Sequence, residues 1–147
     1  KYSKPMSCSV DGKDGKKIFV KMGSYGIGVS RLVGAIIEAK YINDKMKWPL
    51  SVSPFDVVII PAINKKDDTN INKALKIYNE LKKKGVDVLL DDVEEGIANK
   101  FKKHDLLGIP FQIIIGSKST EDKFEFKEVG KDSKIIDSKQ IIKILRN

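Results

Sequence analysis

The chain has little of the chemistry that small catalytic or metal-binding domains use. Its 147 residues include one cysteine, Cys8, and one histidine, His104. A single cysteine excludes a disulfide framework within the chain and a paired-cysteine metal site. We expect Cys8 to be a small, half-buried residue in a reducing compartment, the cytoplasm. His104 has no candidate partner in the sequence, so we expect it at the surface or boundary of a helix, and we predict no metal site.

Long hydrophobic runs are also lacking, although 41% of the residues are hydrophobic. The apolar stretches are too short to cross a membrane, so we predict no membrane partner. The length allows one domain with a proper core, or one domain and a piece of another. The chain begins with Lys1 rather than methionine, which we interpret as the sign of a fragment or a processed chain.

Arginine is scarce, whereas lysine is abundant. The chain has 26 lysines but only two arginines, Arg31 and Arg146, and its formal net charge is +8. A basic surface suits contact with a polyanion such as RNA. A lysine-rich solvated surface has the same composition, and lysine is a weaker choice than arginine for bidentate recognition of phosphates or bases. The scarcity of arginine therefore draws attention to Arg31.

The most informative segment is a glycine-rich loop that ends at Arg31. Gly23, Gly26 and Gly28 lie between an apolar strand-like run and a helix-like run. Glycines let a backbone approach a ligand closely, and the start of a helix offers free N–H groups to an anion. A dinucleotide-binding fingerprint requires a third glycine where Arg31 stands, and a P-loop requires a Gly-Lys-Ser/Thr run that is absent. A nucleotide site of another type and a plain strand-to-helix turn both remain open.

Apolar periodicity predicts an α/β fold. The first part reads as a β-hairpin that feeds a helix, and residues 43–54 read as a connector. After it, short apolar runs alternate with helical patterns, which predicts a mixed, mainly parallel sheet flanked by helices. The expected strands are 7–10, 17–22, 55–61, 86–90, 111–115, 123–129 and a short one at 135–136; the expected helices are 29–41, one between Asp68 and Gly85, 94–107 and 138–145.

The glycine-rich loop and three later segments resemble one family of enzymes. Residues 22–33 are similar to motif 3 of the bacterial-type prolyl-tRNA synthetases, which are class II aminoacyl-tRNA synthetases. The other matches keep their order and spacing along nearly the whole chain: Trp48-Pro49 with Ser53-Pro54-Phe55, Leu90-Asp91-Asp92, and Leu107-Gly108-Ile109-Pro110 with Ile113-Ile114-Ile115-Gly116. The resemblance implies that residues 1–47 end a catalytic domain, 48–53 are a linker, and 54–147 form an anticodon-binding domain.

The resemblance also implies an activity for the complete enzyme. Such a ligase activates proline with ATP and Mg²⁺ and attaches it to tRNA(Pro); we expect a cytoplasmic homodimer. Gly26 and Gly28 would pass under the ATP, and Arg31 would be the catalytic residue that holds the nucleotide and offsets charge as pyrophosphate leaves. Gly23 and Ser24 would line the proline pocket. Motifs 1 and 2 would lie upstream, so we expect this chain alone to be inactive and to hold no cofactor tightly.

For the anticodon we predict contacts from Asp91, Asp92, Glu95 and Lys100. They follow a predicted strand at the edge of the sheet where α/β folds bind ligands. Carboxylates can accept hydrogen bonds from guanine edges in an unstacked loop. The two aspartates could equally be loop and helix-capping residues. Two other function classes also remain open for the chain: a free-standing RNA-binding module with an anticodon-binding fold, and a nucleotide-binding regulatory domain.

Overall fold

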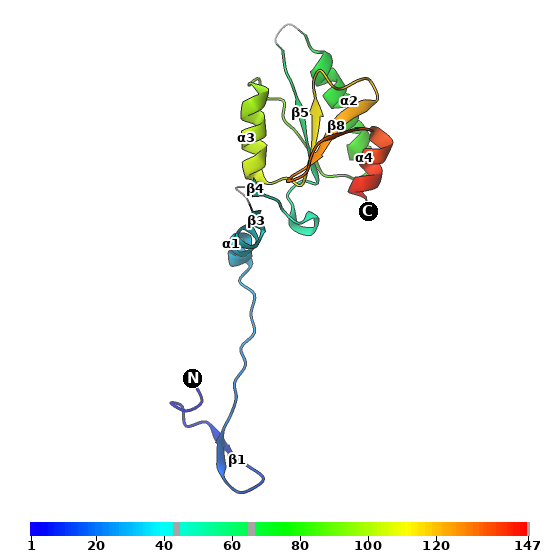
Figure 1. The fold of residues 1–147 in the computed structure, drawn as a ribbon. Coiled ribbons are helices and arrows are strands. Elements are labelled where there is room, and N and C mark those ends of the chain that lie inside the picture. Colours follow the sequence, from blue (N-terminus) through cyan, green and yellow to red (C-terminus); the bar gives the residue numbers. More distant parts are fainter. Residues whose placement is uncertain (43–44, 65–66, 147) are drawn as a thin grey trace. The chain divides into compact units, whose positions relative to one another are not determined.

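The structure is a computed structural model that describes residues 1–42, 45–64 and 67–146 (Figure 1). The chain divides into two compact units, residues 1–33 and residues 34–147. No helix in the described residues is both long and apolar enough to span a membrane.

The first unit contains the expected hairpin and the start of the expected helix. Strands β1 (Ser9–Asp11) and β2 (Lys17–Phe19) pair antiparallel, and helix α1 (Val29–Lys40) begins at the predicted residue. Both strands are shorter than predicted, because the pairing ends at Phe19 and residues 20–28 form no regular element. Cys8 is exposed rather than half-buried, so that prediction was wrong.

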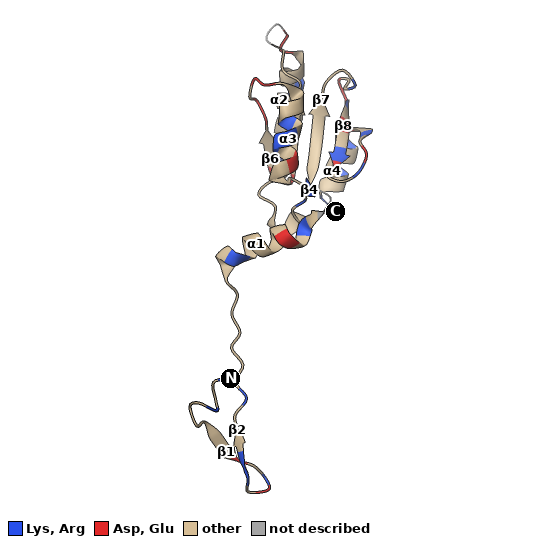
Figure 2. Cartoon of the chain, turned by 60° about the vertical axis from the view of Figure 1, so that its left-hand side comes forward, with Lys and Arg blue, Asp and Glu red and all other residues tan. Residues whose placement is uncertain are grey.

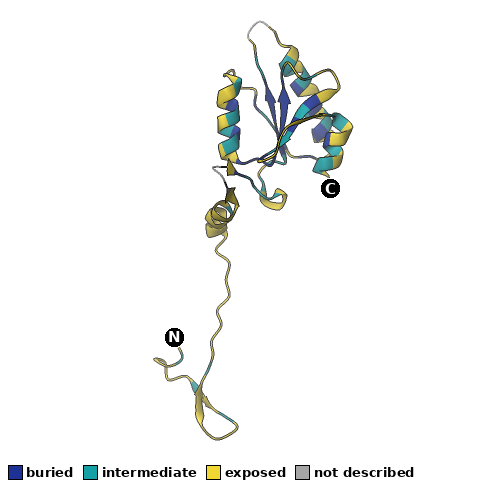
Figure 3. Ribbon diagram, viewed as in Figure 1, coloured by how far each residue is buried: buried dark blue, intermediate teal, exposed yellow. Residues whose placement is uncertain are grey.

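Helix α1 exposes most of its apolar residues. The helix forms as predicted, but none of its residues is buried, and it is drawn as exposed over most of its length (Figure 3). Leu32, Val33 and Ile37 are 43%, 54% and 40% exposed. An apolar helix face of this kind is normally stable only when another surface covers it.

The second unit is built on a five-stranded sheet. Its strands are β5 (Val57–Pro61), β6 (Val88–Leu90), β7 (Phe111–Ile115), β8 (Lys123–Glu128) and β9 (Lys134–Asp137), in the order β6-β5-β7-β8-β9. The pairs β5–β6 and β5–β7 are parallel, whereas β8 is antiparallel to both of its neighbours. Four of the five strands therefore point the same way, which confirms the mixed, mainly parallel sheet.

Helices cover both faces of this sheet. Helices α2 (Thr69–Lys83) and α4 (Ser138–Leu145) pack on one face, and α3 (Ile97–Leu107) packs on the other (Figure 1). Alternation along β5 explains the two cores, since Val57 and Ile59 face α2 while Val58 and Ile60 face α3. Every residue of β5 and of β7 is buried.

The ends of the helices follow their local sequences. Asp137 and Gln140 form a capping box at the start of α4. Gly85 and Gly108 follow α2 and α3 with φ of 75° and 69°, the left-handed region that favours glycine. Helix α3 begins at Ile97 rather than at Glu94, because the chain turns after β6 before the helix starts.

The connector between α1 and β5 is more ordered than the sequence suggested. It contains the short strands β3 (Tyr41–Ile42) and β4 (Lys45–Met46), which pair antiparallel, and the 3-10 helix η1 (Leu50–Val52). Met46 is buried.

Candidate nucleotide and RNA sites

The glycines before α1 are not required by the structure of the chain itself. Gly26 and Gly28 both lie outside the positive-φ region. A Cβ atom added to Gly26 would meet no atom within 4 Å, and one added to Gly28 would only touch Arg31 Cβ at 3.5 Å, an ordinary contact. Neither backbone conformation nor crowding by the described residues therefore explains these two glycines. A molecule that lies against the loop would explain them, because it would need a backbone without side chains.

The other residues predicted for this site lie in the same exposed segment. Arg31 is in the first turn of α1, where the Leu32 N–H already donates to the Gly28 carbonyl at 3.1 Å. Ser24 and Arg31 are both exposed. A Cβ added to Gly23 would approach the Tyr25 ring to 2.8 Å, and Tyr25 is 97% exposed. The segment can form one wall of a site. Arg31, whose guanidinium stays protonated, is the cation on that wall.

The sequence-predicted anticodon residues fall into two groups. Asp92 is exposed and Glu95 is half-buried in the loop between β6 and α3. Asp91 and Lys100 are instead 4% and 0% exposed, and they contact each other. The Lys100 ammonium lies 3.6 Å from the Asp91 carboxylate and donates to the backbone carbonyls of Asp91 (2.8 Å) and Pro61 (3.3 Å). Lys100 therefore ties the carboxyl ends of β5 and β6 to α3.

Several other groups contact the Asp91 carboxylate. Lys103 Nζ lies 2.8 Å from its carboxylate and 2.7 Å from that of Glu95, and the Val93 N–H donates to it at 3.3 Å. His104 Nε2 lies 2.6 Å from the same carboxylate. His104 is 1% exposed, so its expected surface position was wrong. Its partner is 13 residues away in sequence, across the turn into α3, which is why no local pattern revealed the contact.

This arrangement sets the charge of Asp91. Burial raises the pKa of the carboxyl, but the hydrogen bonds from Lys103 and His104, the Lys100 charge and the Val93 N–H outweigh burial and lower the pKa to about 2. The contacts with Asp91 and Glu95 raise the pKa of Lys103 in turn. Asp91 is thus ionised at neutral pH, and groups from within the chain contact its carboxylate oxygens. Its structural role is to fix the loop that carries Asp92 and Glu95.

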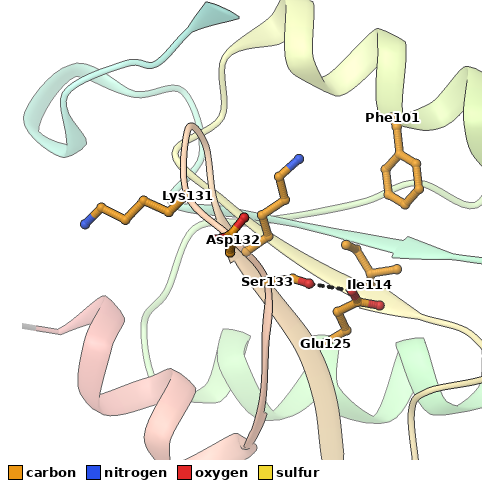
Figure 4. A pocket seen from close by; sticks show the side chains of 7 residues that line it. Phe101, Ile114, Glu125, Lys131, Asp132 and Ser133 are labelled. Carbon is orange, nitrogen blue, oxygen red and sulfur yellow. Dashed lines mark hydrogen bonds between the residues drawn. The ribbon is translucent and has the colours of Figure 1, made fainter.

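A cleft of about 320 Å³ lies on the opposite side of α3 from this loop (Figure 4). Its apolar wall is Phe101 of α3 with Ile114 of β7, and Glu125 lies between them and the turn that joins β8 to β9. Ser133 Oγ donates to Glu125 Oε1 at 2.6 Å, and Lys118 Nζ lies 3.4 Å from the same oxygen. The full lining is Phe101, Ile114, Glu125, Lys127, Lys131, Asp132 and Ser133.

The cleft combines an aromatic ring, a held carboxylate and nearby lysines. Lys127 of β8 and Lys131 of the turn after it line the cleft, and Figure 2 shows basic residues on β8. An aromatic face can stack on an unpaired base, a carboxylate can accept from its amino and imino groups, and lysines attract the phosphates. The sequence analysis missed this surface. The alternation of charged and aromatic residues in 123–129 was its signal, since it places Glu125 and Lys127 on the face opposite Phe124 and Phe126.

The second unit matches a known family of RNA-recognition domains. The model of the anticodon binding domain matches residues 56–147, which include the whole five-stranded sheet and helices α2, α3 and α4. The chain therefore belongs to the anticodon binding domain family.

Particular relatives extend the similarity to the first unit. The chain is 52% identical over 147 residues to the proline–tRNA ligase of Pelagibacter ubique, covering 99% of this chain and 33% of that protein. It is 44% identical over 143 residues to the proline–tRNA ligase of a Sulfurihydrogenibium species, covering 97% of this chain and 25% of that protein. The chain thus spans a quarter to a third of the length of these relatives.

The fold has a counterpart among solved structures. The structure of prolyl-tRNA synthetase from Cryptosporidium parvum complexed with L-proline and AMP superposes with a TM-score of 0.70 at 21% sequence identity. The match covers 98% of this chain and 31% of that chain.

Proposed function

We propose that this chain is the C-terminal part of a proline–tRNA ligase, which activates proline with ATP and joins it to tRNA(Pro) in the cytoplasm. The observation that carries the proposal is the 52% identity, along the chain from hairpin to α4, to a proline–tRNA ligase. Residues 1–47, which include the glycine-rich loop, would end a catalytic domain; 48–53 would link it to the anticodon-binding domain, 54–147. A homodimer is expected for the complete enzyme.

In this proposal the glycine-rich loop is one wall of the ATP site. Gly26 and Gly28 would let the nucleotide lie against the backbone, and the open space around them supports that role. Arg31 would be the catalytic residue, because a guanidinium stays protonated and can offset the charge that develops as pyrophosphate leaves. Gly23 and Ser24 would border the proline. Magnesium would bind with the ATP phosphates, as hard cations prefer oxygen ligands.

The anticodon would be read by the second unit on both sides of α3. Asp92 and Glu95 would face the RNA from the β6–α3 loop, while Asp91 and Lys100 would hold that loop in place rather than touch the bases. The cleft around Glu125 and Phe101 would receive an unstacked base, for which guanine offers the donors that a carboxylate accepts.

The catalytic part of the proposal is tested by proline-dependent exchange of pyrophosphate into ATP. The full-length protein that carries this chain should catalyse the exchange with proline and not with alanine, whereas the 147-residue chain alone should not, because one wall cannot assemble the reacting groups. Arg31→Ala in the full-length protein should lower the exchange rate by about 100- to 1,000-fold. This is the usual loss when a group that stabilises the charge developing in the transition state is removed. Full activity in the Arg31→Ala variant would contradict the assignment.

The RNA part is tested with two transcripts of tRNA(Pro), one native and one with both anticodon guanines replaced. The 147-residue chain should bind both with affinity that falls steeply as salt rises, since lysines act through counterion release. It should prefer the native transcript by about 5- to 150-fold, the usual discrimination that a base-edge contact provides. Glu125→Gln should reduce that preference, and the exposed Glu121→Gln should not. Equal affinities for the two transcripts would show that the surface is basic but not selective.

A further inference from the structure

The carboxylate of Glu125 in the cleft is held by only one of its two oxygens. Ser133 Oγ donates to Oε1 at 2.6 Å (Figure 4), and Lys118 Nζ lies 3.4 Å from the same oxygen. Within the residues that the structure describes, Oε2 has no hydrogen bond or ion pair. The side chain of Glu125 is 16% exposed. A largely buried carboxylate therefore keeps one oxygen ready to accept from a further donor.

The sheet brings Ser133 and Glu125 together. Strands β8 and β9 pair with Phe126 opposite Lys134, so Ser133 stands one residue before β9, next to the position opposite Phe126. This makes Ser133 a diagonal neighbour of Glu125 on the face of the sheet that carries the cleft. The serine reaches the carboxylate from the adjacent strand, without any change in the path of β8.

Of the two groups on Oε1, the serine makes the stronger contact. A separation of 2.6 Å lies in the range of charge-assisted O–H···O⁻ bonds, which are about twice as strong as bonds between neutral groups. The side chain of Lys118 is 70% exposed, and solvent weakens an ion pair at such a position. Ser133 is therefore the main hold on the head of the Glu125 side chain.

The carbon stem of Glu125 lies in a confined place as well. Ile114, which is 7% exposed, stands directly opposite Glu125 on β7, and the Phe101 ring completes the apolar wall of the cleft. Fixing a flexible side chain only when a ligand binds lowers affinity by about 2- to 12-fold. In this cleft the side chain is fixed in advance by contacts within the chain.

We propose that Ser133 is a positioning residue for base recognition in the cleft. Its hydroxyl occupies Oε1 of Glu125 and so keeps Oε2 available to accept a hydrogen bond from an unstacked guanine. The serine acts through the carboxylate and does not touch the base. This inference rests on the proposed function, which assigns the cleft to a base of the anticodon.

The experiment titrates the native tRNA(Pro) transcript and the transcript with both anticodon guanines replaced, using the 147-residue chain. We expect Ser133→Ala to lower the preference for the native transcript by about 2- to 12-fold and to leave the affinity for the replaced transcript unchanged. Ser133→Thr keeps the hydroxyl and should restore the wild-type preference. Ser138→Ala is the matched control and should change neither quantity, because Ser138 Oγ donates to Glu80 Oε1 at 3.1 Å on the opposite face of the sheet.

A double variant shows whether the serine acts through the carboxylate. Once Glu125→Ala has removed the carboxyl group, adding Ser133→Ala should cause no further loss of preference. A further loss would refute the positioning role, because the hydroxyl would then contact the base itself.

The remaining outcomes separate the positioning role from the proposed function. Equal affinities of wild type for the two transcripts would refute base recognition by this chain and the positioning role with it. If wild type discriminates, an unchanged preference in Ser133→Ala refutes the positioning role alone. An equal loss of affinity for both transcripts in Ser133→Ala also refutes that role, because Ser133 would then support RNA binding in general and not the reading of a base.

Discussion

Replacing Asp91 by asparagine should destabilise the second unit far more than a neighbouring replacement does. The variant keeps the shape of the side chain but leaves the ammonium of Lys100, which is fully buried, without its counter-ion. Removing one partner of a buried pair costs about 3–5 kcal/mol, because the remaining charge has lost both water and partner. The lowered pKa of Asp91, about 2 against the ordinary 3.8, shows the same preference of this site for the charged carboxylate.

Urea unfolding of the 147-residue chain, followed by the fluorescence of Trp48, measures this cost. With a slope of about 2 kcal/mol per molar urea, Asp91→Asn should lower the midpoint by about 2 M. Asp92→Asn, the next residue and exposed, should shift it by no more than about 0.3 M. Adding Lys100→Met to Asp91→Asn should recover part of the loss, since no buried charge then remains. Equal midpoints for Asp91→Asn and Asp92→Asn would refute the reasoning.

The same carboxyl makes stability depend on pH in a defined direction. Between the folded pKa of about 2 and the ordinary value of 3.8, the unfolded chain binds the proton and the folded chain does not. The stabilisation is therefore complete above about pH 5 and is lost as pH falls towards 2. Wild type should lose about 2 kcal/mol more than Asp91→Asn over this interval. Parallel pH profiles for the two proteins would contradict the assigned pKa.

Three further changes test other parts of the structure. Gly108→Ala should destabilise the second unit by about 2–4 kcal/mol, because alanine is strained at a left-handed φ and its Cβ would collide with Met46. Gly130 has φ of 84° but open space around it, so Gly130→Ala should cost only about 1 kcal/mol. Thermal or urea unfolding measures both. Phe126→Ala should lower the free energy of unfolding by about 3–5 kcal/mol, because Phe126 is 2% exposed and its ring stacks on that of Phe111 at 5.4 Å. A smaller loss in urea unfolding than Phe101→Ala causes, at a half-buried position, would contradict this. Raising NaCl from about 50 to 200 mM should weaken binding of tRNA to the chain by at least about 10-fold in a fluorescence titration, and a flat response would exclude the lysines as phosphate contacts.

Much of the fold was determined by patterns that are local in the sequence. The continuous apolar runs of β5 and β7 are short and flanked by turn residues, so they could only be strands buried on both faces. The strand predicted at 123–129 is β8, and its alternation of charged and aromatic residues buries one face and leaves the other more open. Asp137 caps the start of α4 and Gly85 follows the end of α2, so local residues set both of these helix ends. Such elements are set by periodicity and by the chemistry of a few neighbouring residues.

The candidate sites depended on contacts between distant residues. The sequence placed Asp91 and Lys100 together near one sheet edge, but only packing showed that they form a buried ion pair, while Asp92 lies exposed and the half-buried Glu95 pairs with Lys103. The burial of His104 likewise depends on how α3 lies against β6. The periodicity of a sequence does not show which carboxylate a lysine will contact. That contact depends on long-range packing and on the cost of burying an unpaired charge. The glycine-rich loop is the opposite case, since its residues lie in one segment and the sequence alone predicts it as a site.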